Sequence, residues 1–161
     1  MLKRRELEKA AWGRKKFRAA AELAGLQIVL RSIRSRRHPE PDILCTLRNG
    51  ERVAFELVEL VDPDIARIES TLSNEGVWYA RDHPTLRNLR KHLVENEYIS
   101  KHPMELIAFA GDALGPRNVW VPTHDNNLIQ DWLDQSPFRR LRVVNLGRRE
   151  PGVWLDRVRE P

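Results

Sequence analysis

Two acidic residues on either side of a tight-turn signal are the first candidates for chemistry in this chain. Asp42 and Glu56 are separated by thirteen residues, and Asn49-Gly50 lies between them. Mg²⁺ and other hard divalent cations bind carboxylate oxygens, so two carboxylates held side by side could form a cation site. Without a cation, two such carboxylates repel each other. Whether the two residues can meet depends on the elements that carry them.

A β-hairpin is the element expected to position these acids. Residues 42–48 and 51–58 resemble strands, and Asn49-Gly50 accepts the positive φ angles of a tight turn. A two-residue loop would mix apolar and charged side chains on each face, whereas a three-residue loop over 48–50 gathers the apolar side chains on one face. We expect the second register, because a one-residue slip exchanges the faces. It makes Asp42 and Glu56 direct cross-strand neighbours, with β-carbons about 5 Å apart.

The same two acids also have an ordinary structural interpretation. Asp42 could be a strand-end residue held by nearby arginines, and Glu56 could pair with Arg52 on the same face of the hairpin. From the spacing alone, both interpretations stay open.

The remaining segments predict an α/β fold, with a mixed sheet flanked by helices. Apolar periodicity predicts helices over 3–24, 85–97 and 124–134, and short helices are expected over 62–84. Apolar runs predict further strands over 26–33, 104–110, 118–121, 141–146 and 153–158. A chain of 161 residues is expected to form a single domain.

Composition excludes several classes of protein. Hydrophobic residues make up 41% of the chain and charged residues 32%, which is not the composition of a disordered protein. No apolar stretch approaches the ~20 residues of a membrane span, so we expect a cytoplasmic protein without a membrane partner. The one cysteine, Cys45, excludes an internal disulfide framework and a multi-cysteine zinc site.

The charge is concentrated in a basic N-terminal helix. Residues 1–37 hold twelve Lys and Arg against three acids, a net +9, whereas residues 38–161 hold sixteen against twenty, a net −4. Arg14, Lys15, Lys16 and Arg18 are the candidate phosphate contacts, because neutralising phosphates releases condensed counterions. Nucleic acid is the expected partner. The alternative is a solvated helix without a partner, and a homodimer stays open.

The motif Pro41-Asp42 followed by Glu56-Leu57-Val58-Glu59 resembles the signature of the PD-(D/E)XK nuclease superfamily, in its branches with a degenerate E-x-x-E sequence. The predicted elements also follow the α-β-β-β-α-β order of its restriction-endonuclease-like core, over about residues 15–146. The resemblance implies a DNA endonuclease that hydrolyses phosphodiester bonds with Mg²⁺ or Mn²⁺. The alternative is a nucleic-acid-binding or protein-interaction module that keeps this fold without its chemistry.

The resemblance also implies roles for individual residues. Asp42, Glu56 and the backbone carbonyl of Leu57 would hold the metal ion, with Glu22 of the first helix beside them. The alternative for Glu22 is an ordinary surface acid. Glu59 would be a catalytic acid only if the strand ends or bulges there, because alternation points it to the other face.

The chain departs from the family pattern where a catalytic lysine is expected. Two residues after Glu56 stands Val58, whose apolar side chain can neither orient water nor offset charge in a phosphoryl transition state. Lys91, on the following helix, is the expected replacement, with Lys101 as a weaker one. The alternative for Lys91 is a solvent-facing helix lysine.

Overall fold

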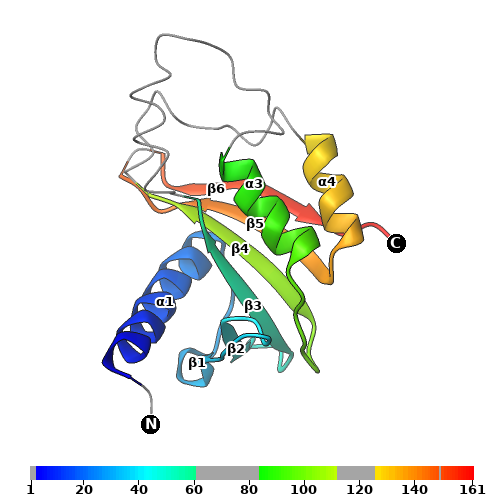
Figure 1. Ribbon diagram of the computed structural model, residues 1–161. Coiled ribbons are helices and arrows are strands. Elements are labelled where there is room, and N and C mark those ends of the chain that lie inside the picture. The colour runs from blue at the N-terminus through cyan, green and yellow to red at the C-terminus, as the bar shows by residue number, and fades with distance from the viewer. Residues whose placement is uncertain (1–2, 61–83, 112–125, 149) are drawn as a thin grey trace.

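A six-stranded mixed sheet forms the centre of the protein (Figure 1). This computed structural model describes residues 3–60, 84–111, 126–148 and 150–161. The strands lie side by side in chain order: β1 (Arg34–Ser35), β2 (Ile43–Thr46), β3 (Arg52–Glu59), β4 (Met104–Ala110), β5 (Phe138–Asn145) and β6 (Gly152–Val158). β3, β4 and β5 are parallel to one another, and the other neighbouring strands are antiparallel. The expected α/β class is confirmed.

Helices cover both faces of this sheet (Figure 1). α1 (Arg4–Leu23) packs on one face. The other face is covered by α3 (Pro84–Arg90), by the π-helical turn η3 (Lys91–Glu95) that continues it, and by α4 (Asn126–Gln135). None of the described helices is long and apolar enough to cross a lipid bilayer.

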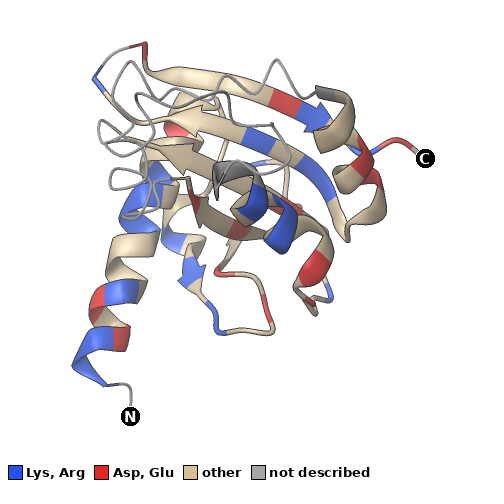
Figure 2. Cartoon of the chain, turned by 45° about the horizontal axis from the view of Figure 1, so that its top comes forward, with Lys and Arg blue, Asp and Glu red and all other residues tan. Residues whose placement is uncertain are grey.

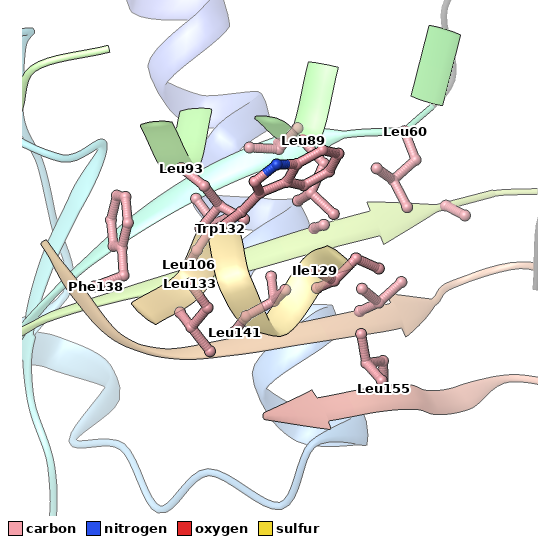
Figure 3. Packing of buried hydrophobic residues seen from close by; sticks show 14 residues of the cluster. Leu60, Leu89, Leu93, Leu106, Ile129, Trp132, Leu133, Phe138, Leu141 and Leu155 are labelled. Carbon is pink, nitrogen blue, oxygen red and sulfur yellow. The ribbon is translucent and has the colours of Figure 1, made fainter. Parts of the chain in front are cut away.

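Each face of the sheet has its own hydrophobic core. Between the sheet and the elements α3, η3 and α4 lie fully buried side chains that include Leu93, Leu106 and Leu133 (Figure 3). Under α1, the rings of Phe17 and Phe55 lie with centroids 5.0 Å apart. Each such side chain contributes about 1.5 to 3 kcal/mol by burial, so the two cores hold the central strands from both sides.

The chain between α1 and β2 differs from its prediction. α1 ends where Gly25 adopts a φ of +69°, as the sequence suggests. The strand expected over 26–33 is wrong, because Leu30–Ser32 form a 3₁₀ turn, and only Ile28 makes a bridge, to Leu47. Ile28 and Ile33 are buried while Leu30 is 59% exposed, a spacing that does not match the two-residue period of a strand.

The other expected elements are found with shifted ends wherever the structure describes them. The helix over 85–97 corresponds to α3 and η3, and that over 124–134 to α4. The strands over 104–110, 141–146 and 153–158 correspond to β4, β5 and β6. The strand expected over 118–121 lies outside the described residues, as do the short helices expected over 62–84, apart from the first residue of α3.

Candidate active site

The hairpin of β2 and β3 places Asp42 beside Glu56. Ile43 pairs with Phe55, which is the register predicted for a three-residue loop. Gly50 closes that loop with a φ of +92°, a conformation in which a side chain would be strained. The predicted register is therefore confirmed.

Two hydrogen bonds from backbone N–H groups to these carboxylates extend the β2–β3 ladder beyond its last backbone pair. The Asp42 N–H donates to Glu56 Oε1 at 3.2 Å, and the Leu57 N–H donates to Asp42 Oδ2 at 3.0 Å. The two carboxyl groups also lie within hydrogen-bonding reach of each other. Asp42 and Glu56 are called the acid pair below.

The acid pair holds a proton at neutral pH. Glu56 is only 6% exposed, and its pKa is raised to about 9, first by burial and then by its hydrogen bond to Asp42 and the charge there. The Tyr98 hydroxyl and the Asp42 N–H act in the opposite direction, since they stabilise the ionised carboxylate. A positive charge held between the two groups would favour release of that proton.

Tyr98 is a site residue that the sequence analysis missed. Its hydroxyl accepts a hydrogen bond from Asn96 Nδ2 at 3.2 Å and lies within reach of Glu56. Its ring packs edge-on against Phe138, with centroids 5.2 Å apart. Burial in the first place, and then Glu56, raise the pKa of the phenol. Tyr98 follows η3 in an irregular segment, where no periodicity signals its direction.

His92 is a second side chain that the sequence analysis missed, and it stands next to Lys91. Burial lowers the pKa of the His92 imidazole, which is also close enough to Asp42 to be acted on by its charge. Lys91 is exposed, and within the described chain no hydrogen bond or ion pair joins it to the acid pair. Leu89 is buried, and residue 92 lies one helical turn after it, so helical spacing could have indicated His92.

The protonation of His92 follows from its backbone contact. Its Nδ1 lies 2.9 Å from the Asn88 carbonyl oxygen, which can only accept a hydrogen bond. Nδ1 therefore carries the proton of the neutral ring, and Nε2 is the nitrogen that can accept one.

Val58, two residues after Glu56 where a catalytic lysine is expected, belongs to the core. It is 1% exposed and packs in the cluster under α3 and α4. Leu60 is buried in the same cluster, so the exposed Glu59 between them points to the opposite face. β3 keeps its regular pairing with β4 through Glu59. The Glu59 side chain therefore points away from the face that carries the acid pair.

The structure separates the expected metal ligands. Glu22 is exposed on α1, whereas the acid pair lies on the sheet face that α3 and η3 cover. In the part of the chain that is described, no three acidic, His or Cys residues gather into a metal-binding group. The Leu57 carbonyl is better placed, because the N–H and C=O of a strand residue point to the same side, and its N–H already bonds Asp42.

The helix α1, whose basic residues are blue in Figure 2, packs on the face of the sheet opposite to the acid pair. Lys15 and Arg18 are exposed, and Lys16 is half-buried. Arg14 donates a hydrogen bond to the Ser35 hydroxyl at 2.7 Å. A contact to phosphates next to the acid pair therefore has to come from other residues.

Comparison of this chain with models of protein families, with curated proteins and with solved structures finds no match in any of the three. What the acid pair does has to be inferred from its own geometry.

Proposed function

We propose that the protein is a Mg²⁺-dependent nuclease of the PD-(D/E)XK type that hydrolyses phosphodiester bonds in DNA. The observation that carries the proposal is the meeting of Asp42 and Glu56 at the end of the β2–β3 hairpin. The arrangement around them supports it as well, since α1, β1, β2, β3, α3 and β4 follow one another in the family's order, with β3 and β4 parallel.

The donor set of the site suits Mg²⁺. Two carboxylates and the Leu57 carbonyl are all oxygen donors, and Mg²⁺ commonly takes one or two carboxylates while it keeps several waters. Mn²⁺ accepts the same type of ligand. A divalent ion bound there would polarise the phosphate and lower the pKa of its bound water.

Side chains from the segment after α3 would complete the site in place of the missing lysine. The Tyr98 hydroxyl holds Glu56 in position through its hydrogen bond. His92 has a lowered pKa, so it is neutral near pH 7, and its Nε2 can accept a proton as a general base. Val58, by contrast, contributes only packing.

Plasmid nicking in the presence of Mg²⁺ tests this proposal. Asp42→Asn and Glu56→Gln should each reduce nicking by about 100-fold or more, because each removes a carboxylate from the cation site. Glu59→Gln is the matched control, since it removes an exposed carboxylate from the same strand on the opposite face. Nicking that survives both acid-pair substitutions would assign the activity to another site or to a contaminant.

A nucleic-acid-binding or protein-interaction module without catalysis is the second candidate, favoured by the burial of Val58 in the core. In that case neither Mg²⁺ nor Mn²⁺ would support nicking. Binding would then be the same for the wild type and for Asp42→Asn, which separates this candidate from the first.

A further inference from the structure

A cavity of about 330 Å³ lies on the same face of the sheet as the acid pair. Its floor is the part of β2 and β3 nearer the hairpin loop, where Ala54 stands two residues before Glu56 and shares its face. The segments 36–41 and 99–102 supply its walls. Pro41, which lines the cavity, directly precedes Asp42. The cavity and the acid pair are therefore neighbours along one hairpin.

Three cations whose side chains have no hydrogen-bond or ion-pair partner among the described residues line this cavity. Arg36, Arg52 and Lys101 are exposed, and no side-chain hydrogen bond or ion pair joins any of them to another described residue. Among the described lining residues, Glu40 is the one acid, and His102 adds a titratable donor. With His102 neutral, these side chains give the lining a formal charge of +2, three cations against one acid. A cavity of this charge favours an anionic ligand.

We infer that this cavity binds a backbone phosphate of the nucleic acid beside the bond presented to the acid pair. The inference deepens the proposed function and rests on it for the identity of the ligand. Arg offers a planar set of N–H donors that matches phosphate oxygens, and Lys acts as a point charge. The phosphate grip at this face thus comes from Arg36, Arg52 and Lys101, while α1 lies on the other face.

Binding measured without divalent ions separates the cavity from catalysis. A fluorescein-labelled DNA duplex is titrated with the full chain in EDTA, and anisotropy is followed at several KCl concentrations. Arg52→Gln and Lys101→Gln should each weaken binding about tenfold, because each removes a charged hydrogen bond to phosphate. Each should also reduce the slope of log K against log salt by about 0.9. Arg52 lies in a strand and Lys101 in a loop, so one variant remains informative if the other folds poorly.

Arg37→Gln is the matched control. Arg37 is exposed and adjacent to Arg36, but it does not line the cavity, so its loss should change affinity less than twofold. If Arg37→Gln weakened DNA binding as much as the two cavity variants, the attraction would be diffuse and electrostatic, and the inference would be overturned. Inorganic phosphate that competes as well as DNA at equal phosphate concentration would also overturn it, in favour of a free-phosphate site.

The two proposals can fail separately. Tight, salt-dependent binding that needs the cavity, without any nicking, would refute the nuclease and leave the cavity in place. Normal nicking by Arg52→Gln and Lys101→Gln, with unchanged affinity, would refute the cavity alone.

Discussion

Replacing Glu56 by glutamine should remove a pH dependence of stability that the acid pair creates. The pKa of Glu56 is raised on folding from its ordinary 4.5 to about 9. A carboxyl group with a raised pKa binds its proton more tightly in the folded state. Its contribution is therefore fully present below about pH 4.5 and is lost as the pH rises through 9.

The size of this pH dependence follows from the interval between the two pKa values of Glu56, 4.5 and about 9. Each pH unit between the two pKa values lowers the free energy of unfolding by about 1.4 kcal/mol. Between pH 5.5 and pH 8.5, Glu56 alone should lower it by about 4 kcal/mol, a large share of the ~5–15 kcal/mol that holds a typical domain together. Glutamine has a similar shape, stays neutral, and can still accept a hydrogen bond from the Asp42 N–H. The Glu56→Gln variant should therefore not lose this stability as the pH rises.

Urea unfolding in EDTA, followed by circular dichroism at pH 5.5, 7.0 and 8.5, measures how the free energy of unfolding changes with pH. The difference in pH dependence between the wild type and Glu56→Gln isolates Glu56, because the other titrating groups are common to both proteins. Glu59→Gln, on the same strand but exposed, should follow the wild type. Parallel profiles for the wild type and Glu56→Gln would refute the reasoning, since they would mean that Glu56 is ionised in the folded protein.

Three other predictions concern the scaffold. Gly50→Ala should lower the free energy of unfolding by about 1 kcal/mol, because φ is +92° there, and a thermal melt with no shift would contradict it. Glu105→Gln should cost about 3 kcal/mol in urea unfolding, because the Glu105 and Arg142 side chains are both 5% exposed and the substitution leaves Arg142 without its carboxylate; an unchanged midpoint would argue against the pair. The Cys45 thiol is buried and its pKa is raised to about 12, so a thiol reagent at pH 8 should label it only as fast as the protein opens. Labelling at the rate of a free thiol would contradict that burial.

The hairpin was predictable because its residues leave little choice. Alternation between apolar and polar side chains determines the register, and the glycine needed for the loop is present at position 50. The proximity of Asp42 and Glu56 follows from that register. The core position of Val58 follows as well, once helices are known to cover that face.

The parts that were missed depend on tertiary contacts. The run over 26–33 has the composition of a strand, but its side chains only cover the edge of the core under α1, and a 3₁₀ turn interrupts it. The charge of Lys91 favours it as the replacement lysine, whereas the spacing from Leu89 directs the neighbouring His92 inward. Tyr98 reaches Glu56 from an irregular segment, whose path no local pattern determines.

Two backbone amides donate the hydrogen bonds that extend the β2–β3 ladder, so their NMR signals report on the acid pair. The amide proton of Asp42 is bound to one carboxyl group of the acid pair and that of Leu57 to the other. Any ligand that draws electron density from those oxygens must move the resonances of both amides together. A two-dimensional ¹H–¹⁵N spectrum therefore reads the occupancy of the pair directly, with neither substrate nor turnover.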